Sequence, residues 1–308
     1  MYVPFTGLGL YNGFRGNAWL KNRIEIFKQF VVPSLKHQTN KNFVLWFSWR
    51  PEEKNNPIVQ EFIKSMQNTF WMGSLDGIKV VSTYTGICFY DDKYPDDVAR
   101  KRLANSLHGA MQTLVNVIGE CDHVLMTIQP SDDIYHKDAV EGIQKVLSLH
   151  YNAVGFRRGY ICNYNTKEVA EYNPQTNPPF YTIKFPRAVF IDPNEHIQYT
   201  SMKRQKGKYE PGTPLPSHEY VEDVFLGKYA IIDDLRGFMV GTHGANISTT
   251  FTNPYKGQIV DEEVLKDFGI YDVPGIKIKV GIGKKIFLKL PFKVQRKLRY
   301  WFNEKLKI

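Results

Sequence analysis

Strand-like and helix-like segments alternate through the first half of the chain, and this alternation constrains the fold more than any other feature. Runs rich in β-branched and aromatic residues occupy 42–49, 78–84 and 123–128. Apolar residues recur at helical spacing in the segments near them, which are 18–32, 57–70, 97–118 and 139–147. Pro33 is expected to end the first helix. Such alternation is typical of a mostly parallel sheet flanked by helices, so we predict the α/β class.

The pattern changes after about residue 150. Short strand-like runs there are separated by turn-rich segments, at 152–156, 160–164, 189–191 and 237–240. Segment 198–216 lacks apolar periodicity and includes a basic cluster, Lys203 to Lys208, that is either a lid or a mobile loop. Ser217 is predicted to begin a helix that reaches about Tyr229. We expect one domain over 1–275, made of halves 1–150 and 151–275, and a separate tail, 276–308.

Almost all of the net charge of +9 lies near the C-terminus, where residues 284–308 contain nine basic residues and one acid. The rest of the chain is nearly neutral, so we expect no specific nucleic-acid partner. After Pro291 the tail has helical spacing of large apolar residues, at Val294, Leu298, Trp301, Phe302 and Leu306. A basic amphipathic helix of this kind is typical of an anchor on an anionic membrane surface. The alternative is a helix packed on the body.

Other compositional signals favour a cytoplasmic protein. No apolar run reaches the length of a membrane span, and the first residues do not have the pattern of a secretory signal. Cys88, Cys121 and Cys162 are far apart, which argues against a zinc site or a disulfide framework. We therefore expect a cytoplasmic location, peripheral on the inner face of a membrane if the tail is an anchor.

Two adjacent acids follow the strand-like run 123–128, within Gln129-Pro130-Ser131-Asp132-Asp133. Ligands of open α/β sheets bind at the carboxyl ends of strands, and carboxylates are the protein ligands that Mg²⁺ and Mn²⁺ prefer. Asp133 and Asp132 are therefore candidate ligands of a divalent cation that holds a diphosphate. The alternative is that either one caps a following helix.

Other polar residues could complete this site. His243 follows a strand-like run and begins a glycine-containing turn, where its imidazole could face the same edge and suit Mn²⁺. The alternative is a histidine bonded to local backbone. Asn246 could bind phosphate or sugar, or could simply occupy the turn. Arg15 lies between two glycines, Gly13 and Gly16, and its guanidinium suits phosphate; a solvated arginine is the alternative.

Three groups of residues resemble the rhamnosyltransferase family of glycosyltransferase-like proteins, and together they span roughly 13–250. These are Gly13-Phe14-Arg15-Gly16-Asn17 with Trp19, Arg23, Phe27, Val32-Pro33-Ser34-Leu35 and Gln38; the turn Ser131-Asp132-Asp133; and His243-Gly244-Ala245-Asn246 with Ser248. Gln129 and Ser131 stand where this family has charged residues.

The resemblance implies a GT-A-like fold, with a nucleotide-binding first half and an acceptor-side second half. It implies metal-assisted transfer of a sugar, rhamnose by the family name, from a nucleoside diphosphate to a hydroxyl of a glycan or lipid-linked glycan. His243 would complete the metal shell, and Arg102 would lie on the donor-binding helix unless it belongs to that helix's polar face. An acid beneath the acceptor would act as the base, and the candidates are Glu219, Glu222 and Asp223.

Two other functions stay open at this point. The first is a non-catalytic protein that binds polyanions or membranes on an α/β scaffold. The second is a nucleotidyltransferase on the same fold, which would release pyrophosphate instead of a nucleoside diphosphate. The chain contains no phosphate-binding loop of the GxxxxGK type and no GxSxG nucleophile motif, which argues against P-loop and hydrolase functions.

Overall fold

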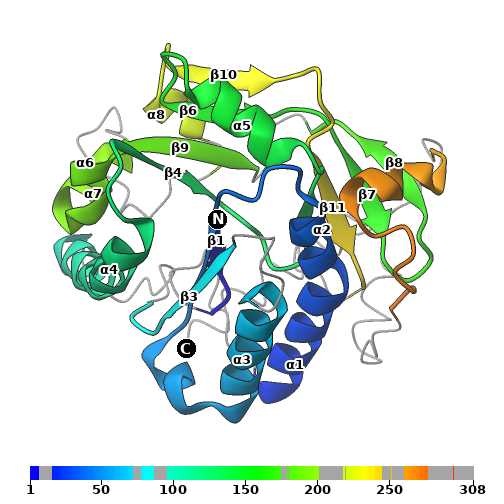
Figure 1. Ribbon diagram of the computed structural model, residues 1–308, viewed down its shortest axis with the longest axis horizontal. Helices are drawn as coiled ribbons and strands as arrows, with labels where there is room; N and C mark the ends of the chain where they lie inside the picture. Colours follow the sequence, from blue (N-terminus) through cyan, green and yellow to red (C-terminus); the bar gives the residue numbers. More distant parts are fainter. Residues whose placement is uncertain are drawn as a thin grey trace.

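The computed structural model describes residues 1–6, 16–71, 78–86, 96–174, 178, 180–200, 218, 220–244, 251, 260–276 and 294. Within these residues the chain is a mixed α/β protein, which confirms the predicted class. Figure 1 shows α4, α6 and α7 grouped on one side of the molecule and α1, α2 and α3 grouped on another. Residues 201–217 and nearly all of the tail lie outside the described residues. No helix in the described part is long and apolar enough to cross a membrane.

A parallel sheet forms the first part of the fold. Its strands, in the order β1-β2-β3, are β1 (Tyr2–Pro4), β2 (Val44–Ser48) and β3 (Lys79–Thr83). The helix α3 (Pro57–Trp71) connects β2 to β3, and its start is as predicted, because Asn56 Oδ1 accepts the N–H of Ile58 at 3.0 Å. Both faces of this sheet are buried, since Val3 packs with α1 and α3 while Tyr2 packs with α4.

The helical segment between β1 and β2 does not end at Pro33 as predicted. It comprises α1 (Asn17–Ile26), a π-helical segment (Phe27–Val31) and α2 (Val32–His37). Proline lacks the N–H that an uninterrupted α-helix uses, and the wider π-helical segment absorbs this irregularity. Pro33 is then the second residue of a new helix, where proline is tolerated.

After β3 the order in which strands are added to the sheet reverses. The helix α4 (Asp96–Ile118) leads to β4 (His123–Thr127), which lies on the other side of β1. A parallel bridge joins Tyr2 to Ile128, and the N–H of Gln129 donates to the carbonyl of Tyr2 at 2.8 Å. The carboxyl end of β4 therefore lies beside Tyr2, the first residue of β1, and the order of the parallel strands reverses between β1 and β4. Open α/β sheets bind their ligands at such a topological switch point.

The second half contains mixed strands, as predicted. A four-stranded sheet has the order β10-β6-β9-β4 and includes β6 (Ala153–Phe156), β9 (Tyr181–Pro186) and β10 (Tyr229–Ile232). A second four-stranded sheet has the order β5-β11-β7-β8 and includes β5 (Ile134–Tyr135), β7 (Gly159–Asn163), β8 (Val169–Tyr172) and β11 (Phe238–Thr242). The helix α5 (Ala139–Leu147) spans the apolar residues that predicted it, but β5 separates it from the acidic turn.

Two predictions about this half are wrong. Residues 189–191 form no strand, because they end the helix α6 (Arg187–Ile191), which precedes α7 (Pro193–Thr200). The helix predicted from Ser217 is only α8 (Val221–Val224) within the described residues, and Tyr229 instead begins β10. In both places the three or four apolar residues are compatible with a helix and with a strand. Packing against α4 and pairing with β6 then decide which of the two forms. A 3₁₀-helix (Glu262–Phe268) follows later.

Candidate functional site

The turn Ser131-Asp132-Asp133 lies directly after the carboxyl end of β4 and before β5, at the switch point between β1 and β4. Neither aspartate caps a helix, since β5 follows and Asp138 precedes α5. The placement predicted for the two acids is therefore present, and the helix-cap alternative is wrong.

Asp132 is bound from two other elements. The Arg23 guanidinium, on α1, forms an ion pair with Oδ2 of Asp132 through Nη1. Nε2 of His243, just after β11, lies 3.2 Å from the same oxygen. The structure thus brings His243 to Asp132 as the sequence suggested. Arg23 was among the residues of the family resemblance, but its pairing with Asp132 could not be read from the sequence.

The ion pair keeps Asp132 charged. Burial alone would raise its pKa, but the positive charge of Arg23 and the hydrogen bond from His243 outweigh burial and hold the pKa well below its usual range. An ionised carboxylate only accepts hydrogen bonds, so Nε2 of His243 carries the hydrogen that it donates to Asp132.

Asp133 faces the opposite way, toward β11. Its side chain is 9% exposed, and Oδ1 accepts the backbone N–H of Gly241 at 2.9 Å. Burial and the neighbouring charge of Asp132 raise its pKa well above the usual range. The two adjacent acids therefore differ in state, because Asp132 is held ionised and Asp133 favours its protonated form.

Buried contacts fix the conformation of the turn. The side-chain amide of Gln129 donates to the carbonyls of Pro130 and Asp133, both at 2.8 Å. The hydroxyl of Tyr164 donates to the carbonyl of Asp132 at 2.9 Å. A Cβ on Gly241 would lie 2.2 Å from that same carbonyl oxygen, so only glycine fits there. Gln129 was noted only as a departure from the family pattern, and nothing in the sequence pointed to Tyr164.

These contacts do not fit a divalent cation. The ionised oxygen of Asp132 is already shared by Arg23 and His243, and Asp133 is turned into β11. Across the described residues, no three His, Cys, Asp or Glu side chains are grouped as a metal would require. The predicted ligands are therefore close together, but in this arrangement they form a hydrogen-bonded ion pair and not a metal shell.

The remaining predicted site residues are not gathered around Asp132 in the described part of the structure. Arg102 lies half-buried on α4, whose apolar residues pack on the face of β1–β3 opposite to α1. Glu222 and Asp223 are exposed on α8. Burial, and secondarily the charge of Glu222, raise the pKa of Tyr229. The other three candidates, Arg15, Glu219 and Asn246, lie outside the described residues.

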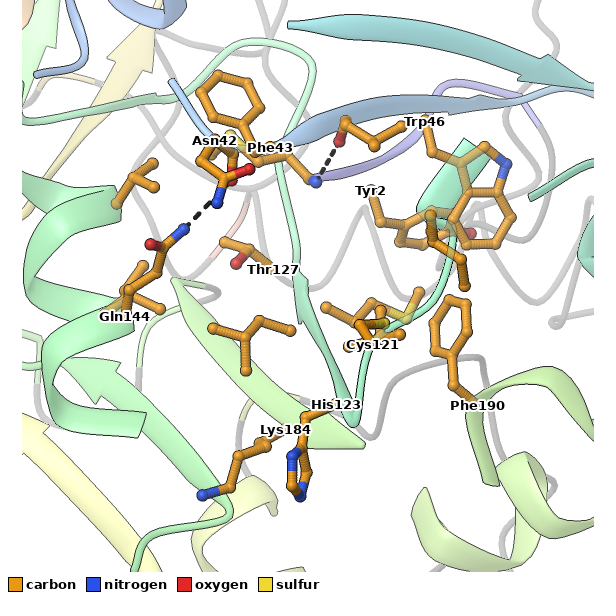
Figure 2. A pocket seen from close by; sticks show the side chains of 18 of the residues that line it. Tyr2, Asn42, Phe43, Trp46, Cys121, His123, Thr127, Gln144, Lys184 and Phe190 are labelled. Carbon is orange, nitrogen blue, oxygen red and sulfur yellow. Dashed lines mark hydrogen bonds between the residues drawn. The ribbon is translucent and has the colours of Figure 1, made fainter. Parts of the chain in front are cut away.

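A cavity of about 660 Å³ lies at the opposite edge of the sheet, near the amino ends of β2, β3 and β4. Figure 2 shows His123 and Lys184 on one side of this cavity, with Asn42 hydrogen-bonded to Gln144 on another. The described lining residues include no carboxylate. Size would favour this cavity as a ligand site, but the charged groups and the switch point favour the turn at Asp132, and we place the candidate site there.

Comparison with known proteins adds little to this geometry. No family model matches the chain, and no curated protein matches it. Among solved structures, S. aureus TarS residues 1–349 aligns with a TM-score of 0.38 at 13% identity, covering 78% of this chain and 59% of that one. Another TarS structure aligns with a TM-score of 0.35 at 10% identity, covering 88% of this chain and 44% of that one. The chain thus spans about half the length of these proteins, and alignments this weak carry no argument about the site.

Proposed function

We propose that this chain is a glycosyltransferase that takes a sugar from a nucleoside-diphosphate donor and transfers it to a hydroxyl of a glycan acceptor. The observation that carries the proposal is the position of Asp132, with Arg23 and His243, at the switch point between β1 and β4. Phosphate-bearing ligands of open α/β sheets bind at this place. The motif resemblance to the rhamnosyltransferase family supports the same activity.

In the proposed reaction the bond from the sugar C1 to the diphosphate oxygen breaks, and a bond forms from the acceptor oxygen to C1. Negative charge grows on the departing diphosphate, and a fixed guanidinium such as Arg23 can neutralise it. Asp132 positions Arg23 for that role through the ion pair, and His243 fixes Asp132 from the other side.

The acceptor hydroxyl must lose its proton to a base. Glu219, Glu222 and Asp223 remain our candidates, since an acid near the acceptor is what this step needs. Glu222 and Asp223 are exposed, so an acceptor could reach them from solvent.

The more specific parts of the proposal come from the family resemblance and from the composition of the chain. They are a GT-A-like fold, rhamnose as the sugar, a glycan or lipid-linked glycan as the acceptor, and contact of the basic tail with an anionic membrane surface. Arg15, Arg102 and Asn246 are proposed to bind the donor.

Donor binding can be tested by thermal unfolding with a panel of UDP-, GDP- and dTDP-linked sugars. A ligand that binds the folded state raises its stability by mass action, by about 2.7 kcal/mol at a hundred times its Kd. We expect one nucleotide family to raise the melting temperature of the wild type. Glu120→Gln, on an acid that is 95% exposed, is the control variant and should respond in the same way. Absence of any shift across the panel would count against the proposal.

A further inference from the structure

We propose that the Arg23 guanidinium occupies the place on Asp132 that a divalent cation would take, so that the chain binds a nucleoside diphosphate without Mn²⁺ or Mg²⁺. The statement about the cation stands on the geometry of the turn alone. The statement about the diphosphate rests on the proposed function.

The first argument is the occupancy of one oxygen atom. Protein sites for Mn²⁺ and Mg²⁺ usually contain one or two carboxylates in direct contact with the ion. In this structure Oδ2 of Asp132 already contacts Nη1 of Arg23 and lies 3.2 Å from Nε2 of His243. A divalent cation on the same carboxylate would therefore lie against a permanently charged guanidinium, and the two positive charges would repel each other.

The second argument is that Asp133 does not supply a replacement ligand. Its Oδ1 accepts the N–H of Gly241, and its side chain is 9% exposed. The close approach of Gly241 to the carbonyl of Asp132, together with the bond from Tyr164 to that carbonyl, resists rotation of the turn. Asp132 is therefore the one of the two carboxylates that contacts Arg23 and His243, and Arg23 balances its charge.

The third argument is that Arg23 is built into the fold. It is 6% exposed on α1, between the buried residues Leu20 and Ile24, and its guanidinium lies 5.7 Å from the ring centroid of Trp19. These contacts hold the guanidinium in a defined position, as expected for a fixed counter-ion. A solvent-exposed arginine that swings toward an acid would not have them.

Such a guanidinium can serve a donor directly. It carries five N–H donors in a planar fork, and the ion pair with Asp132 is made through Nη1. The same group can therefore hold Asp132 and a phosphate oxygen together, with Asp132 fixing its direction. Hydrogen bonds to the diphosphate would then come from the remaining N–H groups of the guanidinium and not from a metal ion.

Direct Mn²⁺ binding tests the cation part and needs no substrate. The electron paramagnetic resonance signal of free Mn²⁺ is lost when the ion binds a protein. With the wild type in tenfold excess over Mn²⁺, we expect less than a tenth of the signal to be lost through Asp132. In Arg23→Ala the carboxylate is released, and we expect at least half of the signal to disappear. Arg23→Lys keeps the charge and should behave as the wild type, and Arg187→Ala removes a surface ion pair as the matched control.

The inference is overturned if the wild type removes most of the Mn²⁺ signal and Asp132→Asn restores it. The comparison of the wild type with Asp132→Asn shows whether Asp132 binds Mn²⁺ even if Arg23→Ala fails to fold. Circular dichroism would reveal such a failure.

Calorimetric titration with UDP, GDP and dTDP, in EDTA and in Mn²⁺, tests the diphosphate part. We expect one of these nucleotides to bind with affinities that agree within about twofold in the two conditions. A tenfold or greater loss of affinity in EDTA overturns this part. Failure of all three to bind in either condition overturns it together with the proposed function, while the Mn²⁺ result still decides the role of Arg23.

Discussion

At the scale of single residues, two adjacent aspartates with the same chemistry have opposite roles because their surroundings differ. Asp132 receives a guanidinium and an imidazole, and Asp133 receives a backbone N–H in a buried place. The sequence shows that both acids follow a strand. It does not show which cation reaches them, since Arg23 and His243 come from segments far away in the chain.

Removing the two charges one at a time should separate these roles. Asp132→Asn leaves the buried Arg23 without a counter-ion, and we expect the free energy of unfolding to fall by about 3–5 kcal/mol. Asp133→Asn keeps an acceptor for Gly241 and removes a carboxyl whose raised pKa destabilises the wild type at pH 7, so we expect no loss of stability, or a gain. Urea unfolding at pH 7 measures both. Equal losses in the two variants would contradict the assignment.

The two aspartates should also differ in how their contributions depend on pH. The pKa of Asp133 is raised in the folded state, so its contribution to stability is present below the ordinary pKa of about 3.9 and is lost as pH rises through the folded pKa. The pKa of Asp132 is lowered, so its contribution is present above about 3.9 and is lost as pH falls through the folded pKa.

Urea unfolding of the wild type and Asp133→Asn between pH 4 and pH 8 checks the pH dependence expected for Asp133. The stability of the variant relative to the wild type should rise with pH, by at most about 1.4 kcal/mol per pH unit. The loss caused by Asp132→Asn should stay nearly constant over the same range. A constant difference for Asp133→Asn would show that Asp133 is ionised throughout.

At the scale of elements, the site depends on how β11 packs against the turn after β4. β11 supplies the Gly241 N–H and leads into His243, so its position sets the contacts of both aspartates. β11 is held by parallel pairing with β7 and antiparallel pairing with β5. These pairings join distant segments, and for that reason the periodicity of the sequence could locate a strand near 237–240 but could not show that it lies beside Asp133.

A pair of glycine-to-alanine changes tests this packing. Gly241→Ala would place a Cβ 2.2 Å from the carbonyl oxygen of Asp132 and 2.4 Å from the ring of Tyr164, so we expect a loss of about 1–3 kcal/mol. Gly142→Ala, on α5, is the control, because its nearest neighbour would be Ile232 Cδ1 at 3.6 Å. That change should be neutral or stabilising by about 0.5–1 kcal/mol. Thermal unfolding of both variants measures the difference, and a harmless Gly241→Ala would contradict the close packing.

At the scale of the whole molecule, local patterns predicted the first half well and the second half poorly. Long, periodic helices before residue 150 follow from residue spacing, as with α4, whereas the short strands β1 and β5 were not predicted. Strands of the second half pair with segments far away in the chain, and residue spacing does not show such pairing. β9, for example, pairs with β4 and β6, and no short-range signal predicted it. Of the candidate site, the acidic turn and His243 were predicted, whereas the ion pair with Arg23 depends on tertiary packing.

The basic tail is a further property of the whole molecule, and its role in membrane binding is a prediction from sequence. Replacing Arg296, Lys297 and Arg299 by glutamine should weaken binding to phosphatidylserine vesicles roughly 100-fold, at about 1 kcal/mol per basic residue. Co-sedimentation of the full chain measures this, with uncharged phosphatidylcholine vesicles as the control. Equal binding of both proteins to the anionic vesicles would show that these residues do not anchor the chain.

The most direct test of the proposed function is the identity of the product released from a nucleotide-sugar. With the donor that stabilises the protein, and with candidate glycan acceptors, the account predicts release of a nucleoside diphosphate by the wild type in EDTA. It also predicts at least a hundredfold slower release by Asp132→Asn, measured at a temperature where that variant is folded. Release of pyrophosphate, or of no product from any donor that binds, would contradict it.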